Sequence, residues 1–202
     1  MKKIIKGIAA PLPLANIDTD VIMPKRFLIT ITREGLADGT FADLRFDTDG
    51  KQRPEFILNN TPWKQATILI VGDNFGCGSS REHAVWGMRQ LKIDACIGTS
   101  FAGIFYDNAR KNGLALPIVS NDIQDALVKF SSNINCDKLS IDLDTRKIVA
   151  GDISVNFEMD DATRTLLMQG RDDTLETLKY TDAIHNFEDS LNEKMRVSVI
   201  KK

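Results

Sequence analysis

The sequence predicts an α/β domain built from a mixed sheet with flanking helices, and three observations indicate this class. Short apolar, β-branched runs alternate with helical patterns between residues 67 and 130, which is typical of parallel strands joined by helices. Three short alternating segments follow between residues 139 and 158, separated by turn residues, as in antiparallel hairpins. The chain of 202 residues, 43% hydrophobic and 27% charged, is long enough for one domain with a sizeable core. We therefore expect residues 1–202 to form a single domain.

The N-terminal part is expected to begin with a strand and to continue mostly without regular structure. Residues 4–8 form the candidate strand, and two prolines keep residues 10–14 extended. Asp18 and Asp20 lie in a polar loop, where they suggest a metal or acid–base pair or, more simply, a turn or helix cap. Residues 29–64 carry turn signals without a sustained period, so they are expected to form an irregular insert that is either functional or mobile.

The middle of the chain predicts a strand–helix–strand–helix–strand series. Its elements are a strand at 67–71, a helix that contains residues 84–91, a strand at 93–98, a helix from Ser100 to Lys111 with Ser100 as its cap, and a strand at 114–119. Pro117 places that last strand near an edge. Short links between these elements favour parallel pairing.

The C-terminal part predicts hairpin strands and two further helices. After a helix that ends near residue 130, the strands are expected at 139–143, 147–150 and 153–158. Two aspartates at 160–161 open a helix that ends at Gly170, and residues 174–192 form a last amphipathic helix. The C-terminal helices thus span about 160–192.

A glycine-rich loop between the strand at 67–71 and the next helix carries the strongest chemical signal. Gly76 and Gly78 allow backbone angles that other residues resist and close approach to a ligand. Ser79 and Ser80 are expected at N-cap positions, and the helix dipole there favours an anion, to which Arg81 adds a fixed positive charge. A serine hydroxyl becomes a base only where donors and positive charge stabilise its alkoxide, and this loop offers both.

The simpler interpretation of this loop is a structural one. The Ser-Ser-x-Glu run before an apolar helix also fits an ordinary capping box that ends at Glu82. The loop lacks the Gly-Lys-Ser/Thr ending of a phosphate-binding loop and does not match the dinucleotide fingerprint.

Three segments together resemble the swivelling domain of the aconitase superfamily. They are the serine-containing stretch 74–84, the stretch 100–114 that begins Ser-Phe-Ala-Gly-Ile-Phe-Tyr, and the N-terminal stretch 16–28 that begins Asn-Ile-Asp-Thr-Asp. Their order and spacing match that family over nearly the whole chain. The resemblance implies a three-layer β/β/α swivelling domain, as in the aconitase C-terminal domain.

The resemblance also implies a function that is shared between two chains. It implies a hydro-lyase that isomerises 2-isopropylmalate and 3-isopropylmalate by dehydration and rehydration in leucine biosynthesis. A separate large subunit would carry a [4Fe-4S] cluster, and this chain would supply the base. A related hydro-lyase acting on citraconate or another alkyl-malate, and a non-catalytic anion-binding domain, remain alternatives.

The resemblance assigns roles to Ser79, Ser80 and Arg81, and the roles of the other candidates are read from their place in the sequence. Ser79 is the expected base, Arg81 pairs with a substrate carboxylate, and Ser80 helps to hold substrate oxygens. Arg26 is expected either to pair with Asp18 or Asp20 or to reach the ligand. Leu28 and Ile31 offer an apolar wall for a branched alkyl group, although both also fit a place in the core. The residues expected to support the loop are Gly76, Gly78, Glu82, His83, Asp18 and Asp20.

The departure from aconitase lies just before the N-terminal stretch. Aconitase has an arginine there that grips an extra carboxylate, whereas residues 11–15 here contain no cation. An alkyl group in place of that carboxylate is therefore favoured, which leaves several alkyl-malates open.

Composition excludes several other classes. The net charge of −2, without a basic block, argues against a nucleic-acid surface. Because no apolar run is long enough for a membrane helix and the charged start does not fit a signal peptide, the cytoplasm is the expected location. Cys77, Cys96 and Cys136 are widely spaced and only two histidines occur, so we expect no metal or cluster on this chain. Cys96 is expected in the core, and the role of Cys77 is open.

Overall fold

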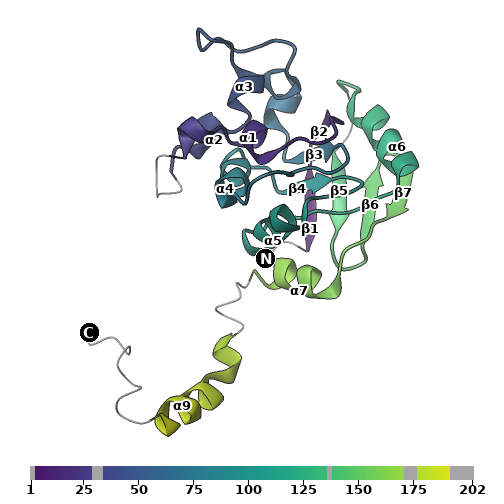
Figure 1. Cartoon of the computed structure of the whole chain (residues 1–202). Helices are drawn as coiled ribbons and strands as arrows, with labels where there is room; N and C mark the ends of the chain where they lie inside the picture. The colour runs from purple at the N-terminus through teal and green to yellow at the C-terminus, as the bar shows by residue number, and fades with distance from the viewer. Residues whose placement is uncertain (1–2, 29–33, 136–137, 171–176, 192–202) are drawn as a thin grey trace. The chain divides into compact units, whose positions relative to one another are not determined.

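The computed structural model describes residues 3–28, 34–135, 138–170 and 177–191. Its contacts divide the chain into one unit of residues 1–170 and a second of residues 171–202, and each is described here by itself (Figure 1). The expectation of a single domain over residues 1–202 stays a prediction.

A three-stranded parallel sheet lies at the centre of the first unit. It contains β2 (Ala9–Leu12), β3 (Ile68–Val71) and β4 (Ala95–Ile97) in the order β2-β3-β4. Single bridges continue it at Ala115 and Ile118, beside β4 and the residue that follows it. The predicted strand at 114–119 is therefore present only as isolated bridges, and Pro117 between them has no N–H to donate.

A second sheet is antiparallel. It contains β1 (Ile4–Gly7), β5 (Leu139–Asp142), β6 (Lys147–Ala150) and β7 (Ile153–Asn156) in the order β1-β5-β6-β7. The predicted hairpin strands are confirmed in place and direction. The mixed α/β class is also confirmed, but the parallel and antiparallel strands form two separate sheets rather than one.

The residues of β3 show why the unit is layered. Leu69 and Val71 belong to a core shared with the helices, whereas Ile68 and Ile70 belong to a core shared with the antiparallel sheet. Alternate side chains of a strand point to opposite faces, so β3 is buried on both sides. Figure 1 shows the resulting order of helices α4 and α5, parallel sheet and antiparallel sheet.

Four helices of at least two turns pack on these sheets within the described part of the first unit. They are α4 (Glu82–Gln90), α5 (Gly103–Lys111), α6 (Asn121–Ser131) and α7 (Asp161–Gln169). Each coincides with a helix that the sequence predicts, although α4 and α5 begin later than their candidate serine caps.

The insert is built from short helical turns in its described part, residues 34–64. These and the turns before them are α1 (Thr19–Ile22), η1 (Lys25–Phe27), α2 (Leu36–Gly39), α3 (Ala42–Arg45), η2 (Ile57–Asn59) and η3 (Trp63–Gln65). Gly87 of α4 lets this region approach closely, because a Cβ there would lie 2.2 Å from Thr40 Oγ1. The insert is thus packed on the helix that follows the serines.

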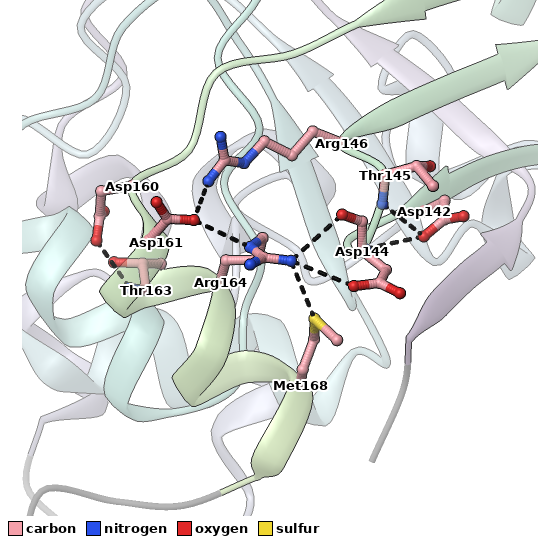
Figure 2. A network of polar contacts seen from close by, with 9 residues as sticks. All are labelled: Asp142, Asp144, Thr145, Arg146, Asp160, Asp161, Thr163, Arg164 and Met168. Atoms are coloured by element: carbon pink, nitrogen blue, oxygen red, sulfur yellow. Dashed lines mark hydrogen bonds and ion pairs between the residues drawn. The ribbon is translucent and has the colours of Figure 1, made fainter.

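A network of ion pairs fastens α7 to the turn between β5 and β6 (Figure 2). Arg146 and Arg164 both reach the carboxylate of Asp161. Arg164 Nη1 also donates to the carbonyl and the carboxylate of Asp144, each at 3.3 Å. Asp160 caps the helix by accepting from the Thr163 N–H at 2.8 Å.

The second unit contains η4 (Leu178–Tyr180) and α9 (Thr181–Ser190) in its described residues. These confirm the C-terminal half of the predicted helix at 174–192, while residues 174–176 and 192 lie outside the described residues. No helix in the described ranges has the length and apolar content that crossing a membrane requires.

Candidate functional site

The serine loop, residues 72–81, connects β3 to α4 and presents both serines at the surface. Ser79 and Ser80 are exposed. The expected cap role is wrong for both, because α4 begins at Glu82 and its N-cap is Arg81, whose side chain makes no capping hydrogen bond. Among the described residues neither serine hydroxyl takes part in a hydrogen bond, so both are available to a ligand.

Backbone hydrogen bonds from residues 16–19 fix the path of this loop. The Gly76 N–H donates to the Ile17 carbonyl at 2.7 Å, and the Thr19 N–H donates to the Cys77 carbonyl at 2.8 Å. The buried Thr19 hydroxyl then donates to the Ser79 carbonyl at 2.9 Å. The N-terminal stretch therefore fixes the backbone of the loop from Gly76 as far as Ser79.

The two glycines before the serines are required by conformation and by space. Gly76 has φ of +78° and Gly78 has φ of +90°, in the region that favours glycine. A Cβ on Gly76 would lie 2.2 Å from Cγ of Phe105, whose ring meets the ring of Phe75 edge-on at 5.5 Å. Their expected role in supporting the loop agrees with this packing.

Arg81 is held beside the serines by an ion pair with Asp20. The Arg81 Nη1 donates to Asp20 Oδ1, and the arginine side chain is only 11% exposed. This hydrogen bond from Arg81 holds the pKa of Asp20 below its usual value. A guanidinium has five N–H donors, so one carboxylate leaves others for a substrate anion.

Asp18 has a different role from Asp20. Its Oδ1 accepts from the Val21 N–H at 2.7 Å as the N-cap of α1. The helix-cap alternative for Asp18 is thus confirmed, and the cap holds the stretch from which Thr19 and Asp20 reach the serine loop.

A second carboxylate braces the start of the loop. Ser100 Oγ donates to Asp73 Oδ1 at 2.5 Å and accepts from the Asn74 N–H at 2.9 Å. The bond from Ser100, with a further one from Thr99, lowers the pKa of Asp73. The sequence predicts Ser100 as the cap of α5, and this prediction is wrong. Ala102 occupies the cap position, without a side-chain hydrogen bond.

Arg26 does not pair with Asp18 or Asp20. Its guanidinium forms two hydrogen bonds with Asp43, at 2.5 and 3.2 Å, and lowers the pKa of that carboxyl. Both groups line a cavity of about 750 Å³ together with Phe27, Phe46 and Arg53. The alternative in which Arg26 pairs with Asp18 or Asp20 is therefore wrong. The carboxylate that it does contact, Asp43, lies in the insert, where the sequence shows no sustained pattern.

The apolar wall is described only in part. Leu28 is half-buried against the helix-side core, in agreement with the alternative that it is a core residue. Ile31 lies outside the described residues.

Glu82 and His83 contact the neighbouring helix and ring. Glu82 Oε1 accepts from Asn112 Nδ2 at 2.7 Å, and the His83 ring centroid lies 4.7 Å from that of Trp86. The sequence does not indicate Asn112 as a contact of Glu82, because Asn112-Gly113 indicates only the end of a helix.

The cysteines show no cluster site in the part of the chain that the structure describes. Cys96 is fully buried in β4, and burial raises the pKa of its thiol. Cys77 is half-buried, with Sγ 3.5 Å from the Asn16 carbonyl. The described residues contain no group of three or more His, Cys, Asp or Glu side chains that could hold a metal.

Comparison with known proteins first defines the class of domain. The aconitase C-terminal domain family matches residues 2–122, the segment that carries the N-terminal stretch, the serine loop and α5. A crystal structure of 3-isopropylmalate dehydratase from Methanocaldococcus jannaschii matches with a TM-score of 0.64 and 30% identity, over 92% of this chain and 99% of that chain.

Two curated relatives then specify the family. The 3-isopropylmalate dehydratase small subunit 1 of Mannheimia succiniciproducens is 46% identical over 93% of each chain. The 3-isopropylmalate dehydratase small subunit of Brucella canis is 47% identical over 91% of this chain and 92% of its own. The chain therefore belongs to the family of 3-isopropylmalate dehydratase small subunits within the aconitase C-terminal domain family, which confirms the resemblance read from the sequence.

Proposed function

We propose that this chain supplies the proton-transferring serine of a 3-isopropylmalate dehydratase. The enzyme would interconvert 2-isopropylmalate and 3-isopropylmalate by dehydration and rehydration, in the leucine biosynthesis that the family serves. The observation that carries the proposal is the exposed Ser79 hydroxyl, which no cap uses and which lies two residues from the anchored Arg81.

Ser79 can act as a base only if its surroundings stabilise the ionised form of its hydroxyl. Ser79 as alkoxide accepts the proton from the carbon next to a substrate carboxylate and later returns it to the neighbouring carbon. Positive charge and preorganised N–H donors stabilise an alkoxide, and Arg81 and the first-turn N–H groups of α4 are the donors nearest in sequence. Ser80 would hold substrate oxygens beside it.

Arg81 would bind a carboxylate of the substrate while keeping its ion pair with Asp20. Because the Asp20 bond fixes one edge of the guanidinium, the remaining donors face a defined direction and lose little entropy on binding. Arg26, Leu28 and Ile31 are proposed to contact the substrate from the edge of the insert.

The dehydration also needs help for the departing hydroxide, and we propose that a separate large subunit provides it. A [4Fe-4S] cluster there would act as a Lewis acid on the substrate hydroxyl. Within the described residues, the buried Cys96 and the half-buried Cys77 lie in different surroundings, and a cluster needs several cysteine ligands close together. The complex is proposed to work in the cytoplasm.

Co-expression with a cluster-bearing large subunit, followed by an anaerobic isomerase assay, tests this function. The expected result is isomerisation of 2-isopropylmalate by the complex and by neither chain alone. Higher kcat/KM for citraconate or another alkyl-malate would reassign the substrate. Carboxylate binding by this chain, without turnover in any complex, would contradict the catalytic role and favour an anion-binding domain.

A further inference from the structure

The first turn of α4 begins without the serine cap that its sequence offers. Arg81 stands at the cap position with an extended backbone, and its side chain turns to Asp20 instead of the helix. A helix start without a capping side chain leaves its first N–H groups unsatisfied and frays more easily. Contacts from outside the helix then gain weight in holding this turn, which follows the serines directly.

Asn112 makes such a contact from the C-terminal end of α5. Its Nδ2 donates to Glu82 Oε1 at 2.7 Å and to the Asn108 carbonyl at 2.9 Å. Its Oδ1 accepts from Trp86 Nε1 at 3.0 Å. Glu82 and Trp86 are four residues apart and so share one face of α4. One carboxamide thus ties the first two turns of α4 to the last turn of α5.

The partners of this carboxamide allow only one orientation of it. Trp86 Nε1–H can only donate, and the Glu82 carboxylate can only accept. Turning the amide around would place its oxygen against the carboxylate and its NH₂ against the indole N–H. Both contacts would be repulsive, so the Asn112 carboxamide keeps one orientation. It therefore fixes where the Glu82 carboxylate lies, and not only how far it is from Asn112.

We propose that Asn112 is a positioning residue for the dehydratase reaction. By holding Glu82 and Trp86 it fixes the start of α4, and through the adjoining peptide it fixes Arg81 and the two serines. The tie replaces a serine cap, which leaves the hydroxyls of Ser79 and Ser80 exposed for chemistry. The catalytic part of this inference rests on the proposed function.

An exchange of donor and acceptor tests the tie in the complex with the large subunit. Asn112→Asp sets a second carboxylate against Glu82, so we expect kcat to fall by about tenfold or more while KM changes by less than about threefold. Glu82→Gln alone should cost less than about threefold, because its amide oxygen can face Asn112. The double variant should return kcat to within about threefold of wild type, since the new glutamine amide donates to the new aspartate.

Hydrogen–deuterium exchange of residues 79–86 in the isolated chain gives a readout that does not depend on turnover. Exchange should rise in Asn112→Asp and fall back in the double variant. Asn156→Asp, the same substitution at an exposed position of β7, is the matched control and should change neither exchange nor kcat. Asn112→Ala removes the tie without adding a charge, and it should also raise exchange. It replaces Asn112→Asp in this measurement if the aspartate variant does not fold.

The outcomes separate the inference from the proposed function. Unchanged exchange in both Asn112 variants, or a double variant as impaired as Asn112→Asp, would overturn the tie. Normal kcat in a folded Asn112→Asp complex would overturn its role in positioning. A wild-type complex without isomerase activity would contradict the proposed function, and with it the catalytic part of this inference.

Discussion

Gly76→Ala should destabilise the first unit by an amount that the structure allows us to divide into two terms. The first term is conformational, because Gly76 has φ of +78°, and a side chain in that region costs about 1–2 kcal/mol. The second is steric, because the new Cβ would lie 2.2–2.6 Å from three atoms of the Phe105 ring, and overpacking a core typically costs about 1–3 kcal/mol. The expected loss is about 2–5 kcal/mol of unfolding free energy, or a Tm lower by about 10 °C.

Two glycine variants separate these terms in the same assay, urea and thermal unfolding followed by circular dichroism. Gly50 has φ of +76° and no atom within 4 Å of a built Cβ, so Gly50→Ala should show the conformational cost alone. Gly103 has neither a positive φ nor a neighbour, and it begins α5, so Gly103→Ala should lose no stability. If Gly76→Ala loses no more unfolding free energy than Gly50→Ala, the steric cost against Phe105 is absent, and the reasoning from the packing of the serine loop is refuted.

Two further variants and one labelling experiment test the charges and thiols of the first unit. Asp20→Asn should lower kcat/KM of the complex by about tenfold or more, because Arg81 loses its anchor. Because the ion pair lowers the pKa of Asp20 in the folded chain, the ionised carboxylate stabilises the fold at neutral pH, and this stabilisation is lost as pH falls through that pKa. The difference in unfolding free energy between wild type and Asp20→Asn should therefore shrink from pH 7 to strongly acidic pH, and an equal difference at both would contradict the ion pair. Arg26→Ala should change stability by less than about 1 kcal/mol, because the pair with Asp43 is more than half exposed, and should raise KM; an unchanged KM removes Arg26 from the substrate site. In the folded chain a maleimide should label Cys77, whereas Cys96, buried and with a raised pKa, should react only after unfolding; mass mapping that finds Cys96 labelled first would contradict its burial.

Periodicity predicted the elements of the fold well because each is decided by a few adjacent residues. The run Ile68–Val71 is apolar at every position, and such a strand must be covered on both faces. The separation into two sheets was not predictable in the same way. It depends on Ile8, where the chain leaves β1 in one sheet and enters β2 in the other, and no local pattern marks that change.

The site was predictable in its residues but not in their contacts. The serine loop stood out because glycines, serines and an arginine follow a buried strand directly. The capping assignment is wrong because Ser-Ser-x-Glu fits more than one start of the helix, and the helix begins only at Glu82, with Arg81 at the cap position and its side chain on Asp20.

Long-range polar contacts were beyond a reading of the sequence. Arg26 pairs with Asp43 across the insert, and Asn112 reaches back thirty positions to Glu82. Such pairs follow from how elements pack, not from spacing along the chain. A short helix that ends in Asn-Gly signals a C-cap, and nothing in that signal identifies the partners of the asparagine side chain.

Deuterium exchange with Ser79→Ala tests the central claim most directly. The wild-type complex should exchange the hydrogen at the carbon that Ser79 deprotonates: substrate deuterated at that carbon should lose its deuterium there, to the neighbouring carbon or to solvent, as measured by NMR of recovered 2-isopropylmalate and 3-isopropylmalate. With Ser79→Ala both exchange and isomerisation should disappear, while the variant still folds and still binds the large subunit. Exchange at the wild-type rate in that variant would show that another group removes the proton.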